Sequence, residues 1–451
     1  MRKNDLLRLS CERLGAELEG IAHAPDGMTV FVPGLLPGEE AQVRVVKVEK
    51  RCAYGRLAGE ILHPSPDRRE NDCPAYPRCG GCSGRHMRYE ATLEAKRRQV
   101  EDCLRRIGGL QAEAEPVLGM EEPVRYRNKT ALPVGGTAGA PVIGFYAPRS
   151  HSIVPVTDCP NAMRPAPELA GALLRWMRRY GIPPYDENSH SGLVRHLVAR
   201  VSRLGEVMAC VVAKGSALPH EAELAEALAR AGADSVLISD NSLRGNVILG
   251  HAFRCLRGRE TLPDTLCGLR FELSPDAFFQ VNPVQCEKLY AAALEEAQLR
   301  PEDTACDVYC GAGTISLAMA GRCRRVLGIE AVPAAVRNAR RNAALNGIEN
   351  AEFRDGEAEL LLPRLVAEGL RPDVIVVDPP RKGLDPAVVR ALHEASPRRI
   401  VYVSCNPATL ARDAGLLHGL GWQAERVRPV DMFCWTSGVE TVVSLSRPMP
   451  G

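Results

Sequence analysis

The sequence has no long apolar run and no strong excess of charge of either sign. No stretch approaches the roughly 18 uncharged apolar residues needed to cross a bilayer, and no apolar core follows Met1–Asp5 as in a secretory signal. We therefore expect a cytoplasmic protein without membrane contact. The 57 basic and 55 acidic residues give a net charge of +2, so the chain as a whole lacks the basic excess of many nucleic-acid-binding domains.

Cysteine is plentiful, but the 16 cysteines of a chain without a secretory signal do not indicate a disulfide framework. Cys73, Cys79 and Cys82 are close together, and Cys159-Pro160 follows far downstream. Glycines between the second and third cysteine allow a tight loop, and proline beside a ligand is common in cluster loops. This three-plus-one spacing differs from the paired spacing of structural zinc sites. We predict a [4Fe–4S] cluster that joins two distant segments, with zinc as the alternative.

The length of 451 residues suggests about three domains, which we place at residues 1–62, 63–275 and 276–451. The first has short β-rich runs at 28–32 and 41–48 between Pro/Gly turns, as in a small barrel. It resembles a TRAM domain, an OB-like RNA-binding module, in three segments: Glu19–Ala22, Val32–Gly34 and Pro37–Glu39. A purely structural barrel is the alternative.

The central domain has a mixed α+β pattern, with helices predicted at 89–107, 165–180 and 219–231. Its segment Arg125–Lys129 interleaves basic side chains with Tyr126. A cation beside a stacking ring is how proteins hold unpaired bases and their phosphates, which makes Arg127 an RNA-binding candidate. An ordinary polar strand is the alternative.

From about Ser274 the pattern alternates strands with helices, which indicates a parallel sheet with right-handed crossovers. The predicted fold class is therefore α/β, with a Rossmann-like C-terminal domain. Its helices are predicted at 284–299, 314–321 and 333–346, and its strands at 303–309, 326–330, 351–354, 374–378 and 400–404.

A cofactor pocket is predicted where the first of these strands gives way to a helix. Gly311 and Gly313 let the backbone approach a ligand there, although the third glycine of a dinucleotide fingerprint is missing. Glu330 ends the next strand, where a carboxylate can accept from both ribose hydroxyls. Asp355 and Asp378 end two further strands, and Asp355 could contact an adenine. Acids suit the cationic sulfonium of S-adenosylmethionine and repel a pyrophosphate, so we favour this donor over NAD.

A cysteine at another strand end is the candidate nucleophile. The run 401–404 is β-rich, and Asn406-Pro407 stops it directly after Cys405. Ligands bind at the carboxyl ends of parallel strands, so this thiol is placed to meet one. A small buried apolar residue is the alternative role for Cys405.

Three motifs, at 278–282, 378–383 and 404–407, occur in the order found in RNA uracil-5-methyltransferases, and the chain resembles that family. It is most similar to the iron–sulfur members with an N-terminal TRAM domain, which modify 23S rRNA in bacteria. The resemblance implies an RNA substrate, with 23S rRNA favoured and tRNA next, and no obligate protein partner. It also implies Cys405 as nucleophile, Glu440 as base, and these residues around the cofactor: Gln280, Tyr309, Thr314, Glu330, Asp355 and Asp378.

The implied chemistry requires a thiol. Addition of a thiolate at C6 of uracil turns the ring into an enolate, whose C5 can attack the methyl sulfonium. A base must then remove the C5 proton so that the thiolate can leave. The uracil must leave its stack to reach the thiol, and Phe278 is a candidate to fill or gate that space. Arg381 and Lys382 are the candidate cations that lower the pKa of Cys405.

One stretch departs from the family. Phe-Pro-His-Thr is expected before Glu440, whereas this chain has Cys434 and Trp435 in place of the Pro-His pair. The change removes a titratable donor, and we expect Trp435 to bring a stacking surface and to alter the geometry near Glu440. The sequence therefore does not decide the geometry near Glu440 or the choice of RNA target.

Two other functions remain possible from the sequence. An RNA cytosine-5-methyltransferase shares the thiolate chemistry, but it would be expected to carry a second cysteine after a Pro-Pro pair, where this chain has Arg381. A non-catalytic, cluster-containing RNA-binding protein would use the fold for binding alone.

Overall fold

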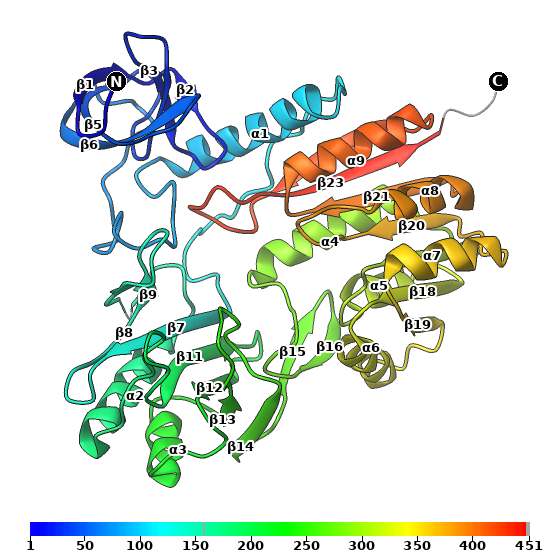
Figure 1. Ribbon diagram of the computed structural model, residues 1–451. Helices are drawn as coiled ribbons and strands as arrows, with labels where there is room; N and C mark the ends of the chain where they lie inside the picture. The colour runs from blue at the N-terminus through cyan, green and yellow to red at the C-terminus, as the bar shows by residue number, and fades with distance from the viewer. Residues whose placement is uncertain (157, 448–451) are drawn as a thin grey trace.

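The computed structural model describes residues 1–156 and 158–447. Figure 1 shows a blue N-terminal barrel, a central sheet in cyan and green, and a larger C-terminal domain that runs from green to red. Within the described ranges, no helix is both long enough and apolar enough to cross a membrane.

The barrel is a six-stranded sheet in the order β1-β5-β6-β4-β3-β2. Alternate residues such as Val43 and Val45 of β5 are fully buried inside it, as expected for strands with one face on a core. The strands predicted at 28–32 and 41–48 are confirmed as β4 and β5. The strands are β1 Leu6–Ser10, β2 Arg13–Leu14, β3 Gly20–His23, β4 Thr29–Val32, β5 Glu40–Val48 and β6 Cys52–Leu62.

Residues 63–88 cross from the barrel without a helix or strand of their own and lead into α1 (Tyr89–Arg106), close to the helix predicted at 89–107. Helix α1 packs on α9 (Pro407–Gly419) of the C-terminal domain (Figure 1). The approach is close where α1 ends, because a Cβ on Gly108 would lie 2.6 Å from the carbonyl oxygen of Ala411. The sequence after the cysteines is therefore fixed to the C-terminal domain.

The central domain is a mixed sheet in the order β14-β13-β12-β11-β7-β8, with α2 and α3 packed together at one side of it. A single apolar core joins the sheet to both helices. The elements are β7 Lys129–Gly136, β8 Pro141–Ile143, β9 Phe145–Tyr146, β10 Ile153–Val154, α2 Ala166–Tyr180, β11 Val194–Val201, β12 Val207–Ala213, α3 Glu221–Arg230, β13 Ser235–Asp240 and β14 Ala252–Arg257.

The hairpin of β15 (Leu262–Leu266) and β16 (Leu269–Leu273) lies between the two larger domains (Figure 1). Its buried residues Leu266, Phe271 and Leu273 belong to the core of the C-terminal domain. Most of the hairpin thus packs with the C-terminal domain although it precedes the boundary predicted after residue 275, and Leu262 of β15 packs on the central sheet instead.

The C-terminal domain is a seven-stranded sheet in the order β19-β18-β17-β20-β21-β23-β22. Its strands are parallel except β23, which is antiparallel to both neighbours. The predicted Rossmann-like α/β domain is confirmed. The elements are α4 Pro283–Ala297, β17 Thr304–Val308, α5 Thr314–Ala320, β18 Arg325–Glu330, α6 Pro333–Leu345, β19 Ala351–Asp355, α7 Ala358–Ala367, β20 Val374–Val377, α8 Pro386–Ala395, β21 Arg399–Ser404, α9, β22 Gln423–Val430 and β23 Glu440–Ser446.

Helices cover both faces of this sheet. One core contains side chains of α4, α5 and α6, and the other contains side chains of α7, α8, α9 and the end of α1. The central strands are therefore almost wholly apolar, and polar side chains gather where the strands end. That edge is where ligands bind in open parallel sheets.

Candidate active site

A cavity opens at the carboxyl ends of β17 and β20. The loop after β17 has Gly313 at a φ of +82°, and a Cβ there would lie 3.0 Å from Ala339 and 3.1 Å from Phe353. Glycine therefore permits both the turn and the close packing at the start of α5. The cavity is lined by Phe278, Phe279, Gln280, Tyr290, Asp307, Tyr309, Cys310, Gly311, Ala312, Thr314, Ile315 and Asp378.

Four of the six predicted cofactor residues line this cavity: Gln280, Tyr309, Thr314 and Asp378. Glu330 stands beside it at the end of β18, where its two carboxylate oxygens accept from the backbone N–H of Gly311 at 3.0 Å and of Val332 at 2.8 Å. Asp355 pairs in register with Glu330 on β19 and is exposed. Both acids lie at the cavity's edge of the sheet.

Asp307 is a buried acid of the cavity that the sequence motif contained but did not single out. Ser316 donates a hydrogen bond to one carboxylate oxygen, and the other oxygen has no partner among the described residues. Burial raises the pKa of Asp307 to about 7. Burial together with the charge of Asp307 also raises the pKa of Asp378 to about 7.

Two tyrosines add polar groups to this wall. The Tyr290 hydroxyl lies 2.7 Å from that of Thr314, and the Tyr309 hydroxyl has no partner among the described residues. Tyr309 adopts a φ of +71°, which is uncommon outside glycine and turns the chain at the end of β17. Unpaired carboxylate and hydroxyl groups fit a cationic ligand with ribose hydroxyls and an amino group.

Cys405 and Glu440 lie at the same end of two neighbouring strands. Ser404 of β21 pairs with Thr441 of β23, Cys405 directly follows Ser404, and Glu440 directly precedes Thr441. The charge of Glu440 accordingly acts on the Cys405 thiol. Cys405 is partly exposed and Glu440 is buried. Asn406 caps α9 by accepting from the N–H of Ala408 at 3.1 Å, which fixes the turn that presents the thiol.

The charges around the pair oppose one another. Burial raises the pKa of Cys405, the carboxyls of Glu440 and Asp378 raise it further, and Arg381 lowers it. Burial also raises the pKa of Glu440 to about 8, again with Asp378 adding to the effect and Arg381 opposing it. An acid with this pKa can both hold and accept a proton near neutral pH.

Arg381, rather than Lys382, is the cation beside the thiol. The Arg381 carbonyl accepts from the side chains of Asn406 at 3.1 Å and Thr409 at 3.3 Å, which ties its loop to the turn after Cys405. The ammonium group of Lys382 lies 3.2 Å from Glu359 instead. Of the two candidate activators, only Arg381 contributes to the pKa of Cys405.

Gln280 and Phe278 reach the cavity on the segment before α4. Asn128 of the central domain donates to the Gln280 carbonyl at 3.1 Å, and its own N–H bonds the Val281 carbonyl at 2.8 Å. These bonds hold the segment in place, with the Gln280 side chain buried and Phe278 73% exposed at the cavity. An exposed ring at this mouth is compatible with the predicted contact to a flipped base.

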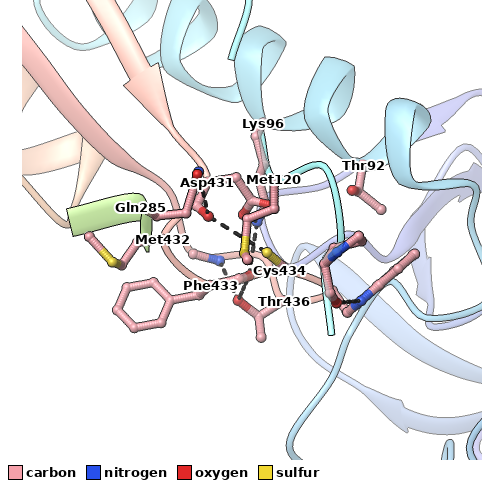
Figure 2. Close-up of polar contacts among 12 residues, drawn as sticks. Thr92, Lys96, Met120, Gln285, Asp431, Met432, Phe433, Cys434 and Thr436 are labelled. Atoms are coloured by element: carbon pink, nitrogen blue, oxygen red, sulfur yellow. Dashed lines mark hydrogen bonds and ion pairs between the residues drawn. The ribbon is translucent and has the colours of Figure 1, made fainter. Parts of the chain in front are cut away.

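The segment before Glu440 is fixed by buried polar contacts to α1. Lys96 donates to Asp431 at 2.5 Å and to the Phe433 carbonyl at 3.1 Å (Figure 2), and both Lys96 and Asp431 are fully buried. Gln285 of α4 donates to the Asp431 carbonyl at 3.2 Å. Removing one partner of such a buried pair typically costs about 3–5 kcal/mol. The segment that leads to Glu440, the predicted base, is therefore fixed to α1 and α4.

Trp435 departs from our expectation, because its ring is not a free stacking surface. It is buried, it donates to the Pro123 carbonyl at 2.6 Å, and its faces meet Tyr89, Arg69 and Arg85 at 5.0–5.3 Å. The N–H groups of residues 83 and 84 bond its carbonyl at 2.9 and 3.0 Å. Trp435 therefore joins the cysteine segment to the chain leading to Glu440.

A second cavity, of about 340 Å³, is lined by all four predicted cluster cysteines, Cys73, Cys79, Cys82 and Cys159. We call it the cysteine cavity. The N–H of Gly81 lies 3.4 Å from the Cys79 sulfur, and the Asn161 amide lies 3.4 Å from the Cys82 sulfur. Arg85 and Arg127 also line the cavity. N–H donors and cations around converging sulfurs suit thiolate ligands.

Arg127 lies in this cavity wall rather than on an open RNA-facing surface, and the neighbouring Tyr126 ring is buried. Tyr126 instead donates to the Cys434 carbonyl at 2.9 Å. In residues 1–156 and 158–447, no three Cys, His, Asp or Glu side chains are arranged to hold a single metal ion. The [4Fe–4S] cluster therefore stays a prediction from the cysteine spacing.

The fold and site together define a class. A seven-stranded sheet with one antiparallel strand and an acid-lined cavity after β17 is the arrangement of a class I S-adenosylmethionine-dependent methyltransferase. A solved structure of Pyrococcus abyssi tRNA (uracil-54, C5)-methyltransferase in complex with S-adenosyl-L-homocysteine is similar, with a TM-score of 0.78 and 28% identity over 97% of this chain and 99% of that chain.

Sequence comparisons give the family. Residues 259–448 match the tRNA (uracil-5-)-methyltransferase model, and residues 4–58 match the TRAM domain. Relatives from Clostridium tetani and Halalkalibacterium halodurans, each described as an uncharacterized RNA methyltransferase, are 42% and 43% identical over 99% of this chain and 97% and 98% of theirs. The chain belongs to this family and is an S-adenosylmethionine-dependent RNA (uracil-5-)-methyltransferase with an N-terminal TRAM domain.

Proposed function

We propose that this enzyme methylates C5 of one uridine in 23S rRNA through a covalent bond between Cys405 and C6 of the uracil. Glu440 is the base that removes the C5 proton. The single observation that carries the proposal is that Cys405 and Glu440 lie next to the paired residues Ser404 and Thr441 at the end of the sheet where Asp378 lines the acid-lined cavity. The acid-lined cavity, which is proposed to bind the cofactor, includes Asp378 and the residues at the end of β17.

The reaction uses the two groups in sequence. The Cys405 thiolate forms a bond to C6, and the C5–C6 electron pair moves onto the ring as an enolate. S-adenosylmethionine, when bound, would supply an electrophilic methyl group to C5, and the electron pair of its methyl–sulfur bond would stay on sulfur to leave S-adenosylhomocysteine. The Glu440 carboxylate then removes the C5 proton, the C5–C6 double bond forms again, and the sulfur of Cys405 leaves as a thiolate.

Other side chains have positioning roles in this proposal. Asp378 and Asp307 place negative charge beside the cationic methyl donor. The Glu330 carboxylate, which accepts from the N–H of Gly311, can accept further hydrogen bonds from the ribose hydroxyls. Gln280 faces the same cavity with an amide able to donate and accept. Phe278 stands at the mouth, where a ring can stack against a base that has left the RNA.

The cysteine cavity is proposed to hold a [4Fe–4S] cluster. The support is the convergence of four thiols, from two distant segments, on one cavity with N–H donors and two arginines. Iron and acid-labile sulfide analysis of anaerobically purified protein tests this. About four irons and four sulfides per chain are expected. Stoichiometric zinc without iron would contradict the cluster.

The RNA target is the finer part of the proposal. The family resemblance favours 23S rRNA, whereas the similar Pyrococcus abyssi enzyme is a tRNA methyltransferase, which keeps tRNA as the second candidate. Either substrate agrees with a cytoplasmic location. The test is mapping of 5-methyluridine in rRNA and tRNA from a strain that lacks this protein, with complementation by wild type and by Cys405→Ala.

We expect one 5-methyluridine in 23S rRNA to disappear and to return with wild type alone. Loss of a 5-methyluridine from tRNA instead would show that tRNA is the substrate and would leave the proposed reaction unchanged. Loss of 5-methylcytidine with unchanged 5-methyluridine would contradict uracil as the target base, and no change in any RNA would favour binding without catalysis.

A further inference from the structure

The N-terminal barrel carries two aromatic rings side by side on its outer face. Phe31 of β4 and Tyr54 of β6 are partners in register, with ring centroids 5.6 Å apart and planes inclined by 29°. Their neighbours Val30 and Ala53 are fully buried, so Phe31 and Tyr54 point away from the barrel core. Both rings are only partly buried. Aromatic residues on an outer strand face are not needed for the core of a barrel this small.

Two cations flank the rings, and they come from different domains. Lys47 of β5 pairs in register with Tyr54, and its ammonium lies 6.0 Å from the Tyr54 ring centroid. Arg149 belongs to the central domain, and its guanidinium carbon lies 5.8 Å from the same centroid. Both side chains are exposed. Two acids adjoin these cations: Lys47 donates to Glu49 at 2.6 Å, and the charge of Arg149 acts on Glu19.

Arg149 is held in place by an ordered turn between β9 and β10. The N–H of Ala147 bonds the Ser152 carbonyl at 2.9 Å, and Arg149 adopts a φ of +54° at the tip. The N–H of Gly80 bonds the Tyr146 carbonyl at 3.0 Å, which ties this hairpin to the cysteine segment. Backbone hydrogen bonds within the hairpin and to the cysteine segment therefore fix the loop that carries Arg149 near the barrel.

We propose that Phe31 and Tyr54 stack an unpaired base of the substrate RNA outside the catalytic cavity, with Lys47 and Arg149 on the adjoining phosphates. The proposal rests on the RNA substrate of the proposed function. Exposed rings accept any base by stacking, and flanking cations follow the backbone. The outer strand face of OB-like barrels is a general surface for single-stranded nucleic acid. Because Arg149 completes the site, the RNA would span the first two domains.

The test is fluorescence anisotropy with a fluorescein-labelled oligouridine of about 12 nucleotides, within the range that one such barrel binds. The double variant Phe31→Ala/Tyr54→Ala is expected to weaken binding by about tenfold to a hundredfold. Tyr54→Phe keeps a ring and should bind as wild type, whereas Tyr54→Leu keeps apolar bulk without a ring and should bind more weakly. Leu6→Ala, an exposed apolar residue on β1, is the matched control and should change nothing.

The two cations are tested by salt dependence. Lys47→Gln and Arg149→Gln should each reduce the slope of log affinity against log salt by about 0.7, as for one phosphate contact to a single strand. Lys3→Gln, an exposed cation of the barrel, should leave the slope unchanged. A thermal melt of each variant separates binding from folding, since Tyr54→Leu and Tyr54→Phe should have similar melting temperatures.

Equal affinity of wild type and Tyr54→Leu would overturn the stacking site and assign the rings to contact between domains. The double variant should still form a covalent complex with RNA containing 5-fluorouridine when that RNA is saturating, because the catalytic cavity is untouched. If wild type binds the oligouridine through the rings but methylates no RNA, the proposed function fails while the stacking site stands.

Discussion

The charges of two carboxyl groups act on Cys405, whereas the cysteine cavity is lined by four thiols and two arginines. Glu440 and Asp378 disfavour a thiolate at Cys405, and Arg381 opposes them. In the cysteine cavity, burial raises the pKa of Cys82 to about 11 but Arg85 lowers it, and N–H donors reach two of the sulfurs. Burial thus raises the pKa of the thiol at both sites, and the sites differ in their neighbours: two carboxyl groups act on Cys405, whereas further thiols, two arginines and N–H donors surround Cys82.

The difference teaches how the surroundings assign a cysteine its role. A nucleophile that must add and later leave should not be too stable as a thiolate. A cluster ligand should be stable as a thiolate at all times. The predictions below change one site at a time and ask whether the other responds.

The largest effect is expected for Cys405→Ala. Without the sulfur no bond to C6 can form, so methyl transfer to RNA should fall by about three orders of magnitude or more. Iron content should stay as in wild type. Cys103→Ala, a partly buried cysteine of α1, is the control and should keep full activity. The readout is transfer of a labelled methyl group, and substantial turnover by Cys405→Ala would exclude it as nucleophile.

Glu440→Gln should slow turnover by about 10²- to 10⁴-fold, the usual contribution of a general base. Addition of the thiol and methylation of C5 do not require this proton transfer, so a methylated covalent complex with RNA should accumulate. Denaturing gel electrophoresis with labelled RNA detects it. Loss of turnover without any accumulated complex would place Glu440 before the methylation step.

Cys82→Ala should reverse the pattern of Cys405→Ala. Iron and sulfide should be lost, and the melting temperature should fall because the cysteine segment contacts the chain before Glu440 through the Trp435 carbonyl. Part of the activity should remain at low temperature. Unchanged iron content in Cys82→Ala, measured beside Cys103→Ala, would remove Cys82 from the ligand set.

Arg381→Gln should give a smaller effect, visible in pH dependence. Arg381 lowers the pKa of both Cys405 and Glu440, so its loss raises both, and the two groups need a higher pH to lose their protons. The rising limb of the pH–rate profile should move to higher pH by about 0.5–1 unit. Lys382→Gln is the matched control, because Lys382 pairs with Glu359, and its profile should not move. A shift in Lys382→Gln of equal size would contradict the assignment.

Much of the catalytic edge could be predicted from the sequence, because strand ends and their acids are local features. Glu330 ends an apolar strand, Asp378 and Cys405 each follow one directly, and parallel strands bring their ends together. Asp307 was harder to predict, since its importance comes from burial of one unpartnered oxygen rather than from a motif. The choice between Arg381 and Lys382 depended on Glu359, which is distant in sequence.

Contacts between domains could not be predicted from the sequence. Trp435 has no local signal that its ring would be covered by Tyr89, Arg69 and Arg85 from another segment. Likewise, the buried pair of Lys96 and Asp431 joins residues more than 300 positions apart, and charged residues are expected to be exposed unless a partner is known. Such pairs are fixed by tertiary packing alone.

The most direct test of the central claim is mass spectrometry of peptides from the enzyme after reaction with RNA carrying 5-fluorouridine at the target position and S-adenosylmethionine. Fluorine at C5 prevents the final proton removal, so the adduct should persist. We predict a methylated fluorouridine attached to the peptide that contains Cys405. Attachment to another residue, or no adduct with an RNA that wild type methylates in its uridine form, would contradict the account.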